Sequence, residues 1–333
     1  MRLRHLVFAP FLVAALAACA AAQDKRPDAK PADPLATFSR LVSDEWRVTF
    51  ASGKSFFHTW HWGPGKHSIR RMTDGYGAGG EPWREVQVFY WHPGRKQVCL
   101  LGVSPVMRGV SEGTIKFEGD TADGVFDIHQ DRGRRKTALR WAFDGPDKFR
   151  DTLLEATGPV GYQTLAEWDH VRVKPPAVPR PRAVEGVKPS ERLKPLEPLL
   201  GRTWESRSDA LSVQSKFEWV PLADAVYARV VSPAKDGEHL LDAYLYHHTG
   251  AKVLRCLALS NRGGVYEGDI TVRDGGALEL DVKGYEGGRE VRHVVRFDFE
   301  KDGTLRQRVW SLKGTERTPT LDIHHKKLQP KKD

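Results

Sequence analysis

The chain has 333 residues, of which 29% are charged, and its formal net charge at neutral pH is +9. This length suffices for two domains of ordinary size, each with its own core. Basic runs at residues 132–136 and 326–332 lie beside expected turns or near the chain end. We interpret them as solvated surface and expect no nucleic-acid partner.

The first 22 residues have the layout of a secretory signal. Arg2 and Arg4 form a basic head, an apolar run extends from Leu6 to Leu16, and small residues lead to Gln23. The apolar run is too short to span a bilayer as a helix. We therefore predict an exported protein that is secreted or periplasmic.

Two modes of signal cleavage fit the sequence. Residues 16–19 (Leu-Ala-Ala-Cys) resemble a bacterial lipobox, in which Cys19 would carry lipid and anchor the chain to the outer membrane. Residues 20–22 are three alanines, which suit ordinary signal peptidase equally well and would leave a soluble protein. In both cases residues 23–34, with several prolines and lysines, are expected to be a flexible segment.

Helical pattern is confined to two short stretches, residues 34–42 and 190–200, and each opens a long series of short strand patterns. In those strands apolar and polar residues alternate, which is typical of antiparallel sheets with one face on a core. Pro-Gly, Thr-Gly and Asp-Gly turn signals separate them. The pattern predicts two all-β domains, residues 35–174 and 190–329, joined by a proline-rich basic linker at 175–189.

An internal repeat supports this division. Residues 89–96 (FYWHPGRK) match residues 245–252 (LYHHTGAK), 156 positions further along the chain. Residues 110–113 (VSEG) likewise match residues 265–268 (VYEG), 155 positions further along. The matches keep their order and spacing over more than a hundred residues in each half. They indicate that one half arose by duplication of the other.

Two cysteines remain beyond the signal, Cys99 and Cys256, one in each half. A domain with a single cysteine cannot form an internal disulfide, so each domain must rely on its apolar core. Both cysteines lie in apolar strand patterns, and we expect both to remain buried thiols.

The order of elements is the same in both halves: a short helix, a turn with a tryptophan (Trp46 or Trp204), and then many short strands. This order resembles the calycin-like barrels, a class that includes lipocalins, fatty-acid-binding proteins and nitrobindin-like domains. The resemblance implies a closed antiparallel barrel of roughly eight to ten strands in each half, with an interior that holds a small apolar ligand. A β-sandwich of equal strand content is the alternative that periodicity leaves open.

Histidines that are close in sequence do not predict a metal site. His58 and His61 are three residues apart in a strand pattern, so their side chains face opposite sides. The adjacent pairs His247-His248 and His324-His325 have the same geometry. No cysteine or carboxylate spacing of the zinc type accompanies them. We expect neither a metal ion nor another cofactor.

Polar and aromatic residues on the inward strand faces are the candidate contacts of a ligand. The first half offers His58, Trp60, Trp62, Thr137, Trp141 and Asp151, and the second half offers Phe217, Trp219, His293, Phe297 and Gln307. An isolated buried carboxylate would be costly, so we expect Asp151 to pair with Arg135 or Thr137. The alternative is that these polar residues are structural members of the core. Its extra tryptophans and its carboxylate make the first half the expected binding domain.

Glu112 and Glu267 recur in the two Glu-Gly motifs, which invites an acid-base interpretation. Glu112, however, falls on the polar strand face of Thr114 and Lys116, so we expect it to face solvent. The sequence has no nucleophile-elbow, zinc-protease or phosphate-loop motif. It therefore provides no positive evidence for an enzyme.

These observations predict an exported, non-catalytic protein of two duplicated barrels. It would bind a small apolar or amphipathic ligand, or serve as a structural module associated with an envelope surface. The alternative is a glycan-binding or glycan-active protein on a β-sandwich. Exposed tryptophans beside paired carboxylates in a groove would favour that alternative.

Overall fold

The computed structural model describes residues 33–328 except 51–52, 77–79, 106–108, 159–160, 175–189, 208–211, 221 and 235–236. The predicted signal with Cys19, nearly all of the 23–34 segment and the predicted linker lie outside the described residues. Within the described part of the chain, no helix has both the length and the apolar character needed to span a bilayer.

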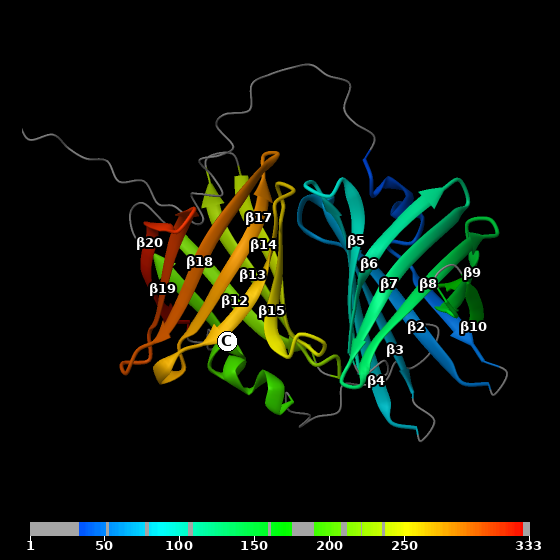
Figure 1. Cartoon of the computed structure of the whole chain (residues 1–333), viewed down its shortest axis with the longest axis horizontal. Helices are drawn as coiled ribbons and strands as arrows, with labels where there is room; N and C mark the ends of the chain where they lie inside the picture. Colours follow the sequence, from blue (N-terminus) through cyan, green and yellow to red (C-terminus); the bar gives the residue numbers. More distant parts are fainter. Residues whose placement is uncertain are drawn as a thin grey trace, which may run out of the picture.

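The first ten strands form a closed antiparallel barrel (Figure 1). Strands that follow one another in sequence pair with each other, and the pairing of β1 with β10 closes the sheet. The strands are β1 (Glu45–Thr49), β2 (Ser55–Trp62), β3 (Ser68–Tyr76), β4 (Pro82–His92), β5 (Gln97–Ser104), β6 (Gly109–Glu118), β7 (Thr121–Gln130), β8 (Gly133–Phe143), β9 (Lys148–Ala156) and β10 (Tyr162–Val173).

A second barrel with the same strand order follows, and the pairing of β11 with β20 closes it. Its strands are β11 (Arg202–Arg207), β12 (Ser212–Val220), β13 (Ala225–Ala234), β14 (Gly237–His248), β15 (Val253–Ser260), β16 (Val265–Val272), β17 (Leu278–Glu286), β18 (Arg289–Phe299), β19 (Leu305–Lys313) and β20 (Glu316–Lys327). Two closed barrels confirm the predicted fold, fit the internal duplication and show that the β-sandwich alternative is wrong.

A short 3₁₀ helix opens each barrel, as the sequence predicts: η2 (Ala36–Arg40) and η4 (Glu191–Leu199). Two shorter helical turns, η3 (Pro64–Lys66) and η5 (Asp274–Gly276), lie in loops. The opening helices are fixed in the same way in both barrels. The indole N–H of Trp46 donates to the carbonyl of Leu41 at 3.1 Å, and that of Trp204 donates to the carbonyl of Leu199 at 3.3 Å. The recurrent tryptophan is therefore an anchor that holds the helix over the barrel.

Each barrel has its own apolar core, built from the inward faces of its strands and from its opening helix. The largest fully buried side chains of the first barrel are aromatic, whereas the second core consists mainly of aliphatic residues. A third apolar cluster contains residues of both barrels and joins them. Cys99 and Cys256 are buried free thiols, which confirms the prediction.

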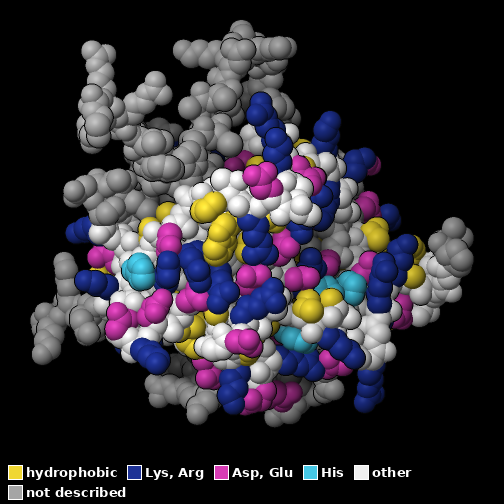
Figure 2. All heavy atoms as spheres, turned by 60° about the vertical axis from the view of Figure 1, so that its left-hand side comes forward, with side chains coloured by type: hydrophobic (Ala, Val, Ile, Leu, Met, Phe, Trp, Pro, Cys, Tyr) yellow, Lys and Arg dark blue, Asp and Glu magenta, His cyan; other side chains and the backbone are white. Residues whose placement is uncertain are grey.

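The surface carries both signs of charge. On the face shown in Figure 2, Lys and Arg side chains alternate with Asp and Glu side chains instead of gathering into one basic patch. Many charged surface side chains form cross-strand ion pairs, such as Arg306 with Asp322 at 2.6 Å. On this face the positive net charge therefore does not form a continuous anion-binding surface.

Candidate functional site

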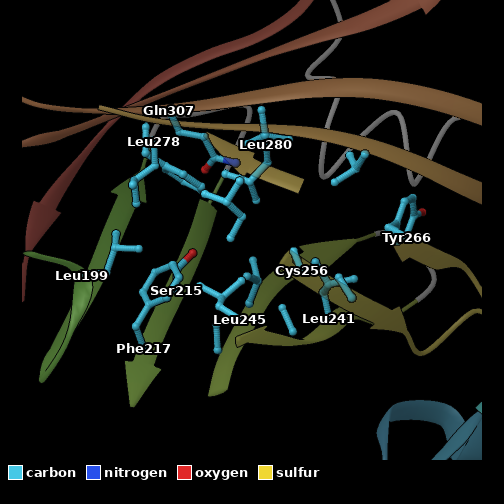
Figure 3. A pocket seen from close by; sticks show the side chains of 18 of the residues that line it. Leu199, Ser215, Phe217, Leu241, Leu245, Cys256, Tyr266, Leu278, Leu280 and Gln307 are labelled. Carbon is cyan, nitrogen blue, oxygen red and sulfur yellow. The ribbon is translucent and has the colours of Figure 1, made fainter. Parts of the chain in front are cut away.

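The interior of the second barrel holds a cavity of about 130 Å³ (Figure 3). Leu199 of η4 lines one side, and apolar side chains of strands β12 to β18 form most of the wall. Ser215 and Gln307 project toward the cavity. The polar residues of the lining are Ser215, Ser232, His239, Ser260, Tyr266, His293 and Gln307. Among these described lining residues there is no Asp, Glu, Lys or Arg, so the wall is apolar with a few neutral hydrogen-bonding groups.

The cavity exists because the second barrel has smaller side chains at positions where the first has large ones. Four lining residues differ in this way from their counterparts in the repeat: Phe217 replaces Trp60, Leu245 replaces Phe89, Cys256 replaces Leu100, and Phe297 replaces Trp141. Protein interiors are close-packed, so several truncations at one level leave a void unless the strands move together. Closure of the sheet by ten paired strands opposes such a collapse.

In the first barrel, aromatic rings occupy the equivalent space. Trp60 and Trp141 are fully buried and cross at right angles, with ring centroids 5.7 Å apart. Phe38 from η2 inserts beside both, at 6.3 and 6.4 Å. Phe89 stacks on Trp60 at 5.6 Å. The cavity therefore lies in the second barrel, whereas the sequence favoured the first as the binding domain.

A neutral histidine lines the cavity of the second barrel, and another hydrogen-bonds to the lining residue Gln307. Gln307 Oε1 lies 2.9 Å from Nε2 of His325, and His293 Nδ1 lies 3.3 Å from the hydroxyl of Ser311. Burial, aided by the neighbouring His324, lowers the pKa of His325 to about 4, and burial lowers the pKa of His293 as well. Both rings are therefore uncharged near neutral pH. The cavity suits an apolar ligand with a neutral polar group better than an ion.

The first barrel contains a buried polar cluster instead. His58 Nδ1 lies 2.7 Å from the hydroxyl of Thr73, and the His58 ring stacks on His170 with centroids 4.8 Å apart. His170 Nε2 lies 3.8 Å from the carboxylate of Asp151. Burial, with a smaller contribution from the Arg71 cation, keeps the pKa of both histidines well below the usual range. Burial also raises the pKa of Asp151 to about 6, although Arg71 opposes that shift.

The expected partners of Asp151 are wrong. Arg135 pairs with Glu155 at 2.6 Å, and the Thr137 hydroxyl donates to the backbone carbonyl of Phe126 at 3.0 Å. Register explains this, because Asp151 lies opposite Trp141 and Trp168, whereas Thr137 lies opposite Glu155, nearer to Arg135.

Three further residues that the sequence pattern did not indicate complete the polar cluster: the buried Arg71 and His170, and the half-buried Glu85. The Arg71 guanidinium lies 3.9 Å from the carboxylate of Glu85 and 5.3 Å from the ring of Trp60. Arg71 shares strand parity with the core residue Ile69, and this parity is the signal that could have identified it.

The predicted contact residues fall into two separate groups. His293, Phe297 and Gln307 line the cavity of the second barrel, together with Phe217. His58, Trp60, Trp141 and Asp151 are buried inside the first barrel, as is Thr137. The remaining two tryptophans lie near strand ends: Trp62 is half-buried, with the Lys66 ammonium 5.9 Å from its ring, and Trp219 is half-buried and does not line the cavity.

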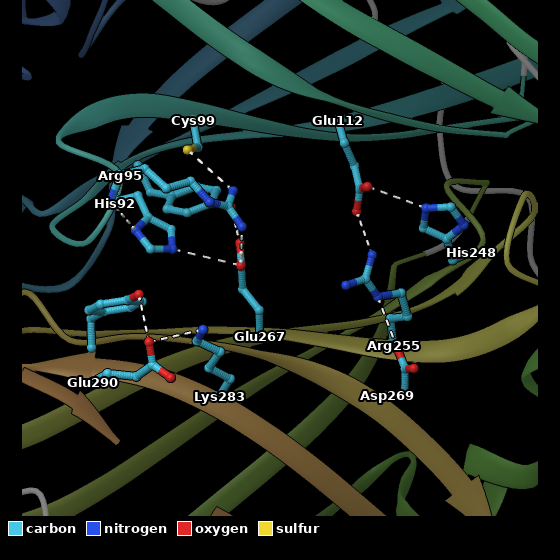
Figure 4. Close-up of polar contacts among 12 residues, drawn as sticks. His92, Arg95, Cys99, Glu112, His248, Arg255, Glu267, Asp269, Lys283 and Glu290 are labelled. Carbon is cyan, nitrogen blue, oxygen red and sulfur yellow. Dashed lines mark hydrogen bonds and ion pairs between the residues drawn. The ribbon is translucent and has the colours of Figure 1, made fainter. Parts of the chain in front are cut away.

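Glu112 does not face solvent, contrary to expectation. It lies between the barrels, where it accepts a hydrogen bond from Arg255 at 3.0 Å (Figure 4). It also accepts a hydrogen bond from the hydroxyl of Tyr246 at 3.3 Å. Burial alone would raise the pKa of Glu112, but the His248 hydrogen bond and the Arg255 cation lower it overall. Strand parity separates inward from outward side chains, and it cannot show which outward side chains a second domain covers.

Glu112, His129 and His248 also have the spacing of metal ligands, since one ligand atom from each lies within 4.8 Å of the others. The hydrogen bonds of His248 argue against this role. Its Nδ1 accepts the backbone N–H of Ala251 at 3.0 Å, so in the neutral ring Nε2 carries the proton. That Nε2–H points to Glu112, 3.3 Å away, and its nitrogen has no lone pair left for a metal. The group is a hydrogen-bonded contact between the barrels.

The fold and the cavity define a protein of two tandem, closed, ten-stranded antiparallel barrels, one packed and one hollow. No known protein-family model matches the chain, and no curated protein matches it in sequence.

Proposed function

We propose that this chain is an exported, non-catalytic carrier of the calycin-like type, whose second barrel binds a small apolar or amphipathic ligand. The observation that carries the proposal is the cavity of about 130 Å³ with its apolar wall, inside a closed barrel. The signal-like first 22 residues support a location outside the cytoplasm, either soluble or lipid-anchored through Cys19.

The size of the cavity limits the ligand. An apolar cavity of roughly 150 Å³ in another protein takes up benzene or xenon, so the cavity here suits one aromatic ring or a short alkyl chain. Because the barrel is closed, the site is already formed before the ligand binds, and binding requires little additional ordering of the protein.

The polar groups limit the ligand further. Gln307 and Ser215 offer a neutral hydrogen-bonding end, and the described lining has no carboxylate or permanent cation to neutralise a charged ligand. A buried charge without a partner is strongly unfavourable. The ligand class supported best is therefore an uncharged molecule with an apolar body and at most a hydroxyl-type or carbonyl-type head.

The proposal can be tested with toluene as the probe, by titration calorimetry and by native mass spectrometry of protein purified from its own envelope. We expect saturable binding of toluene and an added mass on the envelope-derived protein. Leu245→Phe introduces the side chain that the first barrel has at this position and should narrow the cavity, so toluene affinity should fall at least about tenfold.

Leu305→Phe is the matched control. It is the same exchange in the same core, it also copies the first barrel (Phe149), and residue 305 does not line the cavity. This variant should bind toluene like the parent. Equal affinity of all three proteins, or no binding by the parent, would show that the second barrel is not a ligand site.

A further inference from the structure

The two barrels meet through the same surface on each side. The apolar cluster between them contains residues of β4, β5 and β6 from the first barrel and of the corresponding β14, β15 and β16 from the second. Five positions of the repeat occur in this cluster twice, once from each barrel: Val88 and Tyr244, Tyr90 and Tyr246, Leu101 and Leu257, Val103 and Leu259, Val110 and Val265. Each barrel thus uses equivalent residues to contact the other.

The polar contacts around this cluster are reciprocal (Figure 4). Tyr90 of the first barrel donates to Glu267 of the second at 2.6 Å, and Tyr246 of the second donates to Glu112 of the first at 3.3 Å. An arginine from the opposite barrel reinforces each glutamate, Arg95 at 2.6 Å from Glu267 and Arg255 at 3.0 Å from Glu112. The two arginines occupy different positions of the repeat, since Arg95 aligns with Ala251 and Arg255 with Cys99.

Two histidines of the repeat act in the same reciprocal way. His92 and His248 each accept, through Nδ1, a backbone N–H three residues further on, at 3.1 and 3.0 Å. Each then presents Nε2 to the glutamate of the opposite barrel, at 3.7 Å from Glu267 and 3.3 Å from Glu112. The hydrogen bond to the turn fixes the ring, so that its N–H faces the other barrel.

The turns that follow β4 and β14 also dock reciprocally. A Cβ atom on Gly94 would lie 2.3 Å from the ring of Tyr285 in the second barrel, and one on Gly250 would lie 2.8 Å from the ring of His129 in the first. His129 and Tyr285 are themselves 156 residues apart and occupy equivalent strands, β7 and β17. Both turns therefore need glycine for close approach to a ring, beyond any need of the turn itself.

One contact joins a position to its own counterpart. The guanidinium of Arg70 on β3 lies 5.0 Å from the ring of Tyr227 on β13, and the two residues are 157 positions apart, like Trp62 and Trp219. Near a two-fold axis a residue meets its own equivalent, whereas away from the axis residue i meets j and residue j meets i. The contacts between the barrels follow both rules.

We propose that each barrel carries a self-complementary docking surface, and that the partner it fits is a second copy of the same barrel. The chain is then an isologous dimer joined into one polypeptide. This explains why the best-matched motifs of the repeat, around residues 89–96 and 110–113, place their outward residues Tyr90, His92 and Glu112 in the contact between the barrels. Each interface residue of one barrel must fit the equivalent surface of the other barrel, so a substitution in one barrel alone would disturb the contact.

The test starts from the folded full-length protein with a protease site inserted in the 175–189 segment. After cleavage, the second barrel is removed through an affinity tag in a mild denaturant that leaves the circular dichroism of the β-sheet intact, and the first barrel is returned to buffer. At a protein concentration of roughly tens of micromolar, where an isologous interface of modest size should hold, we expect the first barrel to sediment at twice its own mass.

Gly94→Glu is the discriminating variant, because its side chain would meet the ring of the partner's residue 129 and add a charge to the contact. It should sediment as a monomer with an unchanged circular dichroism spectrum, and its association should be at least about a hundredfold weaker. Val125→Glu, at an exposed position on β7, is the control and should remain dimeric. A monomeric parent barrel, folded or unfolded, would overturn the proposal, as would dimers that persist in the Gly94→Glu variant.

Discussion

The two barrels share strand order, helix position and docking surface, yet they fill their interiors in opposite ways. In the first barrel Phe38, Trp60, Phe89 and Trp141 interlock, with ring centroids 5.1 to 6.4 Å apart. In the second barrel, smaller residues at these levels leave a cavity of about 130 Å³. After duplication, the barrels thus kept the surface through which they dock and diverged inside. Divergence inside is where a binding function can arise without loss of the fold.

The polar pairs inside the barrels show the same divergence. Asp151 and His170 in the first barrel correspond to Gln307 and His325 in the second. The first pair is 3.8 Å apart and includes a titratable carboxyl, whereas the second is a neutral hydrogen bond of 2.9 Å. Exchange of a carboxylate for an amide removes the charge from the hollow barrel, which is what an apolar ligand requires.

The largest expected effect is on packing. Trp60→Ala should lower the free energy of unfolding of the first barrel by about 3–5 kcal/mol, because a filled core cannot close around the lost ring. Phe217→Ala at the equivalent position should cost less, since this ring already borders a cavity and has fewer contacts to lose. Urea unfolding followed by circular dichroism measures both. Equal losses, or a larger loss in the second barrel, would contradict the packed-versus-hollow comparison.

The next effect concerns pH. The pKa of Asp151 is raised from 3.8 to about 6 in the folded protein, so ionisation of this group opposes folding. Its penalty is absent below about pH 4, grows as pH rises toward 6, and is fully present above that range. Asp151→Asn should therefore raise the free energy of unfolding by about 2–3 kcal/mol at pH 8, with little change at pH 4.

Asp123→Asn is the control for this prediction, because Asp123 is half-exposed and pairs with Arg140 on the surface. The effect of this exchange on the free energy of unfolding should be small, as expected for an exposed ion pair. An Asp151→Asn variant whose stability gain does not depend on pH would show that Asp151 is not a buried acid with a raised pKa.

The smallest effect is expected at the thiol. Cys256 lines the cavity, and burial raises its pKa to about 12, so it behaves as a small apolar side chain. Cys256→Leu copies Leu100 of the first barrel and should change the free energy of unfolding by less than about 1.5 kcal/mol. Toluene affinity should fall at least as much as in Leu245→Phe, because an isobutyl group in place of a thiol adds more volume to the cavity wall than a benzyl group in place of an isobutyl group. If calorimetry showed the same toluene affinity for Cys256→Leu and the parent, toluene would bind outside this cavity.

The sequence was sufficient for the fold because alternation along single strands and one long repeat are local signals. The opening helices, the strand content, the tandem arrangement and the buried thiols all follow from them. Neither the alternation nor the repeat could show which barrel has a packed core and which has a cavity. Whether a ring such as Phe297 or Trp141 borders a void depends on the total volume of the side chains around it. Those side chains come from the opening helix and from several strands, so no single segment of the sequence determines the total.

The contacts between the barrels were missed for a related reason. Tyr90 and Glu267 are 177 residues apart, and both lie on outward strand faces that alternate like solvated ones. The matched Glu-Gly motifs were visible in the sequence, yet only the second barrel shows that Glu112 is covered. The repeat was a signal for a shared interface, and a search for reciprocal charge and hydrogen-bond partners among its outward residues would have found it.

The most direct test of the central comparison is crystallography under xenon pressure, because xenon enters apolar cavities and leaves packed cores empty. We expect a xenon site in the second barrel, near Leu245 and Phe297, and none among Phe38, Trp60 and Trp141 of the first barrel. Xenon inside the first barrel, or in neither barrel, would contradict it.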